Sequence, residues 1–256
     1  MPPIHHRHQQ GVTLFVVIVF VMLSMLLALW ASRTSLFNEL VVGNDADYQR
    51  AFEAAQALIQ DAELDIRGEN ANGSFCVGTG NVCRTSTADK FPPEAKDVGP
   101  LLANLDLQPT KCRNGLCIKR TGKLDFWNNN DTAQGLTLAQ MTDNTVGARY
   151  GQFTGAALGD ENNPANPILA DTSAFNRGGW YWIEVLPYDE SSKNSGLVVG
   201  GPNNLLPLNL TPSVVYRITA VAFGRKTRPP RTGETGPQPV TVVALQQTYA
   251  RQRTKD

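Results

Sequence analysis

The chain has 256 residues, with 23 Lys and Arg against 23 Asp and Glu, so its formal net charge is zero. A neutral chain lacks the cationic excess with which proteins hold nucleic acids, and we expect no nucleic-acid partner. The three histidines, His5, His6 and His8, all lie close to the N-terminus, and the sequence holds no P-loop, G-x-S-x-G or H-E-x-x-H motif. We therefore expect neither an enzyme nor a bound cofactor.

The first predicted element is an apolar helix over residues 12–31. This stretch carries no charge, and its only polar residues are Thr13 and Ser24. A helix of about 20 residues rises roughly 30 Å, which matches the hydrocarbon core of a bilayer. A secretory signal would usually be shorter and end in small residues, whereas bulky Leu29 stands where a small residue is required. The stretch therefore predicts a membrane-spanning helix.

Residues 1–11 precede this helix as a short polar leader that ends at Gly11. A polar leader, a Gly and an apolar helix that opens with Val12, Thr13 and Leu14 resemble the prepilin signature of type IV pilins and pseudopilins. The resemblance implies that a prepilin peptidase cleaves after Gly11 and N-methylates Val12. Pilins usually carry Glu five residues past the cut, whereas this chain has Val16 there.

Beyond the apolar run, the helix is expected to continue to residue 67. Mostly apolar side chains recur every three or four residues and fall on one helical stripe, namely Phe37, Val41, Asn44, Tyr48, Phe52, Ala55, Ile59, Ala62 and Ile66. The charged residue Asp61 is predicted on or near the opposite side. Gly43 is a predicted weak point, and Arg67 followed by Gly68 is typical of a helix end. We expect the stripe to pack on the chain's own head, although a membrane-proximal stalk would show a similar pattern.

Two further segments make the resemblance more specific. Residues 39–44, ELVVGN, and residues 51–58, AFEAAQAL, resemble the minor pilins of the PilX type, which assist pilus assembly. Those proteins also tend to lack the glutamate after the cleavage site, so Val16 agrees with this branch. The resemblance implies a pilin-like α+β fold, with a long N-terminal helix over residues 12–67 and a globular head over residues 68–256.

Residues 68–177 are expected to form the loop-rich part of the head, because Gly, Asn, Thr and Pro are frequent there. Strands are predicted at residues 116–120, 123–127 and 149–154. The Asn- and Asp-rich loops contain no D-x-[DN]-x-[DN]-G pattern, and we expect no bound metal in them.

All four cysteines, Cys76, Cys83, Cys112 and Cys117, lie in this part of the chain. Their intervals do not match the C-x₂-C knuckles of a four-cysteine zinc site. A domain exported across the inner membrane enters an oxidising compartment, where disulfides persist. Of the three possible pairings, we favour the two short local loops, Cys76–Cys83 and Cys112–Cys117.

Residues 178–252 are predicted to form antiparallel strands. Runs rich in β-branched and aromatic residues predict strands at 180–186, 214–223 and 240–249, and without helical crossovers these form an antiparallel meander. The connection over residues 225–239 is rich in Pro, Gly and basic residues, and we interpret it as an exposed hairpin loop without regular structure. Glu184 is expected either to point outward from its strand or to pair with an Arg.

These features together predict a non-enzymatic minor pilin that helps to initiate type IV pilus assembly at or near the filament tip. The charge of Arg7 in the leader favours a cytoplasmic N-terminus and a periplasmic head in the inner membrane, before the head becomes extracellular in the pilus. The partners that the resemblance implies are the prepilin peptidase, other minor pilins, the major pilin and a large tip adhesin.

Two alternatives remain open. A single-pass, membrane-anchored periplasmic binding or adhesive protein would have the same apolar helix, but it would have no reason to lose residues 1–11. A type II secretion tip pseudopilin would also lack the glutamate, but it would normally carry a larger helical insertion, which the sequence does not show.

Overall fold

The computed structural model describes residues 12–76, 82–84, 89–92, 97–159, 165–187, 214–234 and 236–251. The predicted leader and its last residue, Gly11, lie outside these ranges. The chain divides into two compact units, residues 1–46 and residues 47–256. One helix, α1 (Val12–Arg67), begins in the first unit and ends in the second, and it runs without interruption through Gly43, the predicted weak point.

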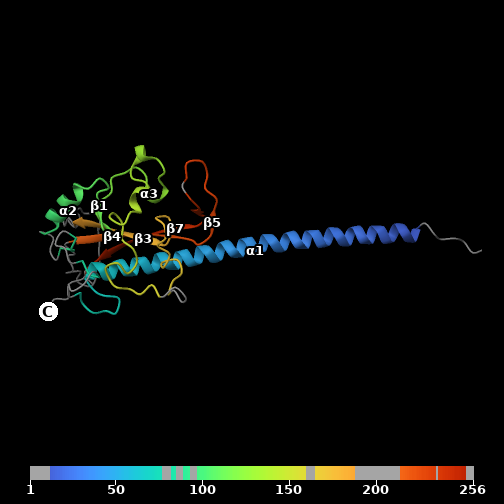
Figure 1. Cartoon of the computed structure of the whole chain (residues 1–256), viewed down its shortest axis with the longest axis horizontal. Helices are drawn as coiled ribbons and strands as arrows, with labels where there is room; N and C mark the ends of the chain where they lie inside the picture. Colours follow the sequence, from blue (N-terminus) through green and yellow to red (C-terminus); the bar gives the residue numbers. More distant parts are fainter. Residues whose placement is uncertain are drawn as a thin grey trace, which may run out of the picture. The chain divides into compact units, whose positions relative to one another are not determined.

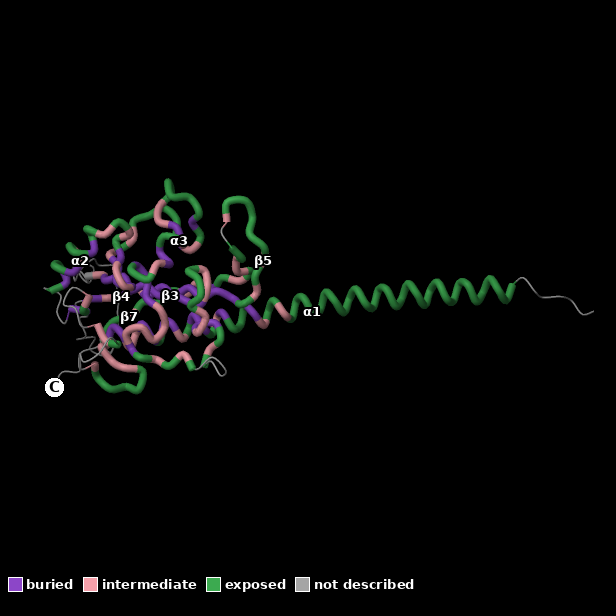
Figure 2. Tube along the Cα trace, viewed as in Figure 1, coloured by how far each residue is buried: buried purple, intermediate pink, exposed green. Residues whose placement is uncertain are grey.

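The described part of the first unit is helical, and its residues are exposed from residue 12 to residue 42 (Figure 2). Its most apolar stretch is long enough to cross a membrane, and none of that stretch is buried. The hydroxyls of Ser24 and Thr34 donate to the carbonyls of Phe20 and Trp30, at 2.7 and 3.0 Å. These two hydroxyls therefore need no water, as a lipid environment requires.

The second unit is an α+β head built on the C-terminal half of α1 and a five-stranded sheet (Figure 1). The strand order is β1 (Cys112–Arg113), β2 (Leu116–Cys117), β3 (Gly179–Pro187), β4 (Val214–Phe223) and β7 (Val242–Ala250). Strands β3, β4 and β7 form the predicted antiparallel meander.

The sheet is not entirely antiparallel, because β2 pairs with β3 in parallel and Leu116 lies opposite Ile183. Strand β2 is the second arm of a tight hairpin whose turn residues, Asn114 and Gly115, have φ of 49° and 78°. Positive φ at both positions is typical of a type I′ turn. The long connection from β2 to β3 removes the preference for antiparallel pairing that short connections impose.

Side chains from both faces of the sheet are buried, so the central strand β3 has no solvent face. Tyr181 and Ile183 belong to the larger hydrophobic core, which includes Leu58 and Ile66 of α1. Trp180 and Trp182 belong to a second core. Phe126, Met141, Val146 and the Cys112–Cys117 pair cover that second face. The loop-rich region thus acts as the cover of a sheet face.

The apolar stripe predicted along the second half of α1 is buried at some of its positions and exposed at others. Ala55, Ile59, Ala62 and Ile66 are buried, whereas Tyr48 is exposed. The placement of Asp61 on the opposite side was wrong, because this carboxylate is buried.

Within residues 68–177, several predicted elements differ from those observed. The strand predicted at 116–120 is limited to β2, and residues 123–127 contain instead the start of the short 3₁₀ helix η2 (Phe126–Asn128). Residues 149–154 form turns, because Gly151 has a φ of 72° that a strand does not adopt. The other helices here are α2 (Val98–Asp106), η3 (Thr132–Gln134) and α3 (Leu138–Met141).

The connection over residues 225–239 also contains regular structure that the sequence did not predict. Strands β5 (Thr227–Arg228) and β6 (Gln238–Pro239) pair in an antiparallel ladder. Arg228 is held by Glu234 at 2.7 Å. This ion pair and the short ladder give the Pro- and Gly-rich hairpin a defined conformation.

Candidate functional site

The described residues contain two candidate sites. One is the N-terminal end of α1, where Val12 is 71% exposed and Val16 is 42% exposed. The other is the set of buried charges that join α1 to the head. No group of three or more His, Cys, Asp or Glu suited to a metal ion occurs in the described part of the chain.

Three buried aspartates lie along the part of α1 within the head. Asp47, Asp61 and Asp65 are 3%, 2% and 4% exposed. Asp47 accepts a hydrogen bond from the backbone amide of Arg225 at 2.9 Å. Buried carboxylates are costly unless they are paired, so each of the three marks a place where another segment must dock onto α1.

Asp65 is the most heavily engaged of the three. Arg84 donates to both its oxygens, with distances from 2.7 to 3.0 Å, and the Tyr181 hydroxyl donates at 3.0 Å. The Arg84 guanidinium also lies 3.7 Å from the centroid of the Phe153 ring. Burial and the nearby Asp65 charge raise the pKa of Tyr181 well above its usual value, so the phenol remains a proton donor.

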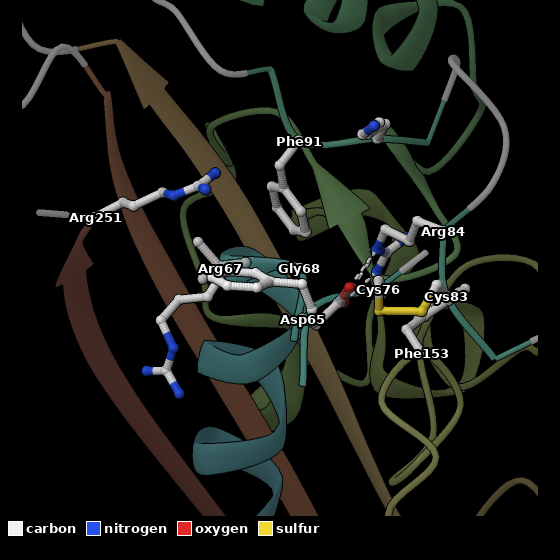
Figure 3. A pocket seen from close by; sticks show the side chains of 12 residues that line it. Asp65, Arg67, Gly68, Cys76, Cys83, Arg84, Phe91, Phe153 and Arg251 are labelled. Carbon is white, nitrogen blue, oxygen red and sulfur yellow. Dashed lines mark hydrogen bonds and ion pairs between the residues drawn. A yellow bond between two sulfur atoms is a disulfide. The ribbon is translucent and has the colours of Figure 1, made fainter. Parts of the chain in front are cut away.

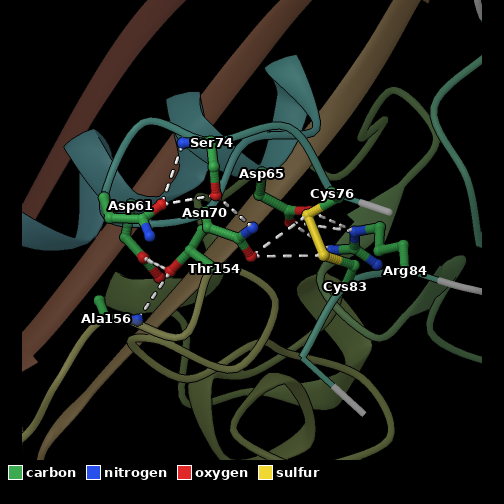
Figure 4. The surroundings of a disulfide bond; sticks show 10 residues. Asp61, Asp65, Asn70, Ser74, Cys76, Cys83, Arg84, Thr154 and Ala156 are labelled. Carbon is green, nitrogen blue, oxygen red and sulfur yellow. Dashed lines mark hydrogen bonds and ion pairs between the residues drawn. A yellow bond between two sulfur atoms is a disulfide. The ribbon is translucent and has the colours of Figure 1, made fainter. Parts of the chain in front are cut away.

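The disulfide Cys76–Cys83 directly precedes Arg84 and lies beside this ion pair (Figure 4). Both sulfurs contact the side-chain oxygen of Asn70, at 3.6 and 3.5 Å. The second disulfide joins Cys112 to Cys117 across the β1–β2 hairpin. Both pairs are the ones favoured from the sequence, and the first fixes the segment that carries Arg84.

A cavity of about 400 Å³ opens beside the Cys76–Cys83 disulfide at the C-terminal end of α1 (Figure 3). Its lining combines aromatic rings, Phe91 and Phe153, with the cations Arg67, Arg84 and Arg251. Arg84 and Arg67 are already paired with Asp65 and Glu69. Among the described lining residues, no nucleophile lies beside a general base.

Asp61 differs from Asp65 in having no cationic partner within the part of the chain that the structure describes. Its oxygens accept from the Gly151 amide at 2.8 Å and from the Thr154 hydroxyl. Burial raises the pKa of Asp61 to about 6, against the lowering effect of these two hydrogen bonds. The contact between α1 and the turn at residues 149–155 therefore includes a carboxyl that titrates near neutral pH.

A separate buried ion cluster crosses the sheet. Glu184 of β3 is 1% exposed, so the expectation that it points outward was wrong, and the alternative of an Arg partner is confirmed. Arg217, its register partner on β4, donates at 2.6 and 2.7 Å, and Arg120 donates at 3.0 Å. Burial alone would raise the pKa of Glu184, but the bonds from Arg217 and Arg120 hold it below its usual value.

The sequence contained a weak signal for the buried aspartates that was missed. Asp61 and Asp65 are four residues apart and alternate with Leu58, Ala62 and Ile66, which places all of them on neighbouring rows of one helix face. An acid at such a position predicts a polar partner from elsewhere in the fold. The partners, Arg84 and Thr154, could not be assigned without the tertiary structure.

The chain has an exposed apolar helix that continues into an α+β head and packs in the core of that head. This arrangement is typical of pilin-like proteins. The family model of the type IV pilus assembly protein PilX, C-terminal region, matches residues 72–251, and the PilX N-terminal model matches residues 10–59. The chain therefore belongs to the PilX family of type IV pilus assembly proteins. No curated protein and no solved structure matches the chain. The family is structural rather than enzymatic.

We predict that Asp61→Asn changes the pH dependence of stability. A carboxyl whose pKa is raised on folding holds its proton in the folded state, so its contribution is greatest below pH 4 and falls as the pH rises through 6. As the pH rises from 4 to 7, the contribution of Asp61 to the free energy of unfolding should fall by an amount on the order of 2–3 kcal/mol. Asn mimics the protonated carboxyl, so the variant should match the wild type at pH 4 and exceed its stability at pH 7, as measured by denaturant unfolding of the full chain in detergent.

Asp143→Asn is the matched control, because Asp143 accepts from the amide and hydroxyl of Thr145 but is only partly buried. These hydrogen bonds lower its pKa, so the pH dependence should have the opposite sign. A difference between Asp61→Asn and the wild type that does not vary with pH would contradict the prediction.

We also predict that Glu184→Gln destabilises the head by about 3–5 kcal/mol, because it removes the buried carboxylate that Arg217 and the more buried Arg120 share. Glu234→Gln removes a carboxylate that is similarly held by Arg228, but at a partly exposed position. It should cost much less stability than Glu184→Gln, because solvent screens the Arg228–Glu234 pair. Equal losses in the two variants, measured by denaturant unfolding, would show that burial of the Glu184 cluster does not matter.

Proposed function

We propose that this chain is a minor pilin that helps to initiate type IV pilus assembly and is incorporated at or near the filament tip. Membership of the PilX family supports the pilus role. The observation that carries the tip placement is Val16, at the position where pilins usually have glutamate.

Maturation comes first in the proposed sequence of events. The prepilin peptidase cleaves after Gly11 and methylates the new terminal amine of Val12. Before assembly, the apolar helix over residues 12–31 holds the protein in the inner membrane, with the N-terminus in the cytoplasm and the head in the periplasm. The exposed apolar surface of this helix supports the membrane role, because exposing it to water costs about 25 cal/mol for each Å².

In the assembled filament, the same apolar surface packs among the N-terminal helices of other minor pilins and the major pilin. In this proposal, the glutamate that pilins usually carry neutralises the terminal amine of a neighbouring subunit already in the filament. A subunit at the tip has no such neighbour, so a carboxylate at residue 16 would have no partner in an apolar bundle and would be costly there. Valine avoids this cost.

The terminal amine of Val12 remains available to pair with the glutamate of the next subunit below. The protein therefore enters the filament first, together with other minor pilins, and its head stays exposed at the end of the extracellular pilus. A large tip adhesin is a candidate partner for this exposed head. The role requires no catalytic residue and no cofactor.

We predict that the mature protein begins at Val12 and carries one added methyl group. Intact-mass measurement on protein extracted from membranes or sheared filaments checks this. Gly11→Leu should block both changes, because the enlarged side chain occupies the residue before the cut, and the precursor should remain in the membrane. Functional protein that keeps residues 1–11 would contradict the proposed processing.

We predict that immunogold labels the protein at filament ends. Deletion of the protein should lower the number of pili. Val16→Glu should lower the number of pili or move the label onto the filament shafts. Val16→Leu, which keeps an apolar side chain, is the control and should behave as the wild type. Val16→Gln adds a polar side chain without a charge, so a comparison with Val16→Glu shows whether polarity or charge causes the effect. Label spaced along shafts in the wild type would overturn the tip placement, as would an absence of effect from both Val16→Glu and deletion.

A further inference from the structure

Two cavities meet on the part of the head between α2 and the end of β2. One, of about 360 Å³, is lined by Leu102 and Ala103 of α2 and by Val185 of β3. The other, of about 370 Å³, lies beside the Cys112–Cys117 disulfide. Asp106, Ile118 and Lys119 line both cavities, so the two cavities are neighbours. We call the surface that these neighbouring cavities form the Lys119 groove.

The two ends of the groove differ in chemistry. The end at Leu102 is apolar, and its charged lining residues are the shared Asp106 and Lys119. The end at the disulfide adds two cations, Lys111 and Arg120, to an apolar wall that includes Leu124, Phe126 and Leu136. An apolar compartment therefore adjoins a cationic one.

The charges of the cationic compartment are not balanced by its own acids. Asp106 pairs with Lys111 at 2.8 Å. Arg120 shares the single carboxylate of Glu184 with Arg217, and its Nη1 has no acceptor among the described residues. Lys119 is exposed and has no ion pair within the described ranges. The compartment is therefore suited to an anionic group.

We propose that the Lys119 groove binds an extended segment of a partner protein that carries an apolar side chain close to a carboxylate. The carboxylate lies beside Lys119 in the cationic compartment, and the apolar side chain fills the compartment at Leu102. Each cavity has the volume of a small-ligand pocket, so two neighbouring cavities fit two side chains of one peptide better than a single small anion. The proposal does not depend on where the subunit sits in the filament.

The test uses the full chain in detergent micelles and fluorescein-labelled, end-blocked hexapeptides. Each peptide carries one Leu and one Glu at a spacing of one to four residues, and each has a Glu→Gln counterpart. At least one Leu/Glu peptide should bind in fluorescence anisotropy, and its Gln counterpart should bind at least about ten-fold more weakly, which corresponds to about 1.4 kcal/mol.

Variants at exposed positions connect binding to the groove without disturbing the core. Lys119→Glu should weaken binding at least ten-fold, because it replaces an attractive charge by a repulsive one. Lys123→Glu makes the same change at an exposed lysine outside both cavities and should leave affinity within about two-fold. Ala103→Glu, which places a charge in the apolar compartment, should also weaken binding.

Three results would overturn the proposal. The first is that no peptide of the set binds at millimolar concentration. The second is that Lys123→Glu weakens binding as much as Lys119→Glu. The third is that acetate or sialic acid competes as strongly as unlabelled peptide, which would indicate a simple anion or acidic-sugar site. Circular dichroism melts of each variant confirm that a loss of binding is not a loss of fold.

Discussion

Three carboxylates on the C-terminal half of α1 must each receive hydrogen-bond donors before that half of the helix can be buried. The donors come from distant parts of the chain: Arg84 and Tyr181 for Asp65, the turn at Gly151 and Thr154 for Asp61, and the amide of Arg225 for Asp47. Gly224 allows the last approach, since a Cβ there would lie 2.1 Å from an Asp47 oxygen. The head is therefore organised around polar contacts to α1 as much as around its apolar core.

The two halves of α1 meet opposite requirements within one continuous helix. In the first unit the side chains are apolar and exposed, which suits lipid or other helices, and the hydroxyls of Ser24 and Thr34 bond to their own helix. In the second unit the buried face includes acids whose partners are fixed by the fold. A helix of this kind can exchange the surroundings of its first half, from bilayer to filament, without altering the contacts of the second.

The elements that the sequence predicted well are those with a strong local pattern. The helix over residues 12–67 and the strands β3, β4 and β7 follow from hydrophobicity and side-chain shape, and the two disulfides follow from short separations. The elements it missed depend on contacts between distant residues. The two-residue strands β1 and β2 are too short to show a periodicity. The parallel pairing of β2 with β3 depends on the tertiary structure and leaves no local pattern in the sequence.

The buried charges were the hardest part of the candidate site to predict. Asp61 was placed with the exposed charges because a polar side chain counts against burial in any hydrophobicity pattern. Glu184 was ambiguous for the same reason, and only the register with Arg217 resolves it. Membership of the PilX family, by contrast, was visible in residues 39–44 and 51–58, which lie in α1 within the stretch that the PilX N-terminal model matches.

The separation between Asp47 and Arg225 has a consequence for the order of folding. The helix is synthesised first, but the donor for Asp47 follows 178 residues later, and the strand that completes the sheet, β7, is later still. Contacts of such high sequence separation form slowly, since a long loop must close before they stabilise anything. The Cys76–Cys83 and Cys112–Cys117 loops, with separations of 7 and 5 residues, can close much earlier. A chain whose two disulfide loops have closed can therefore still expose the acidic face of α1 to solvent until its distant hydrogen-bond donors arrive.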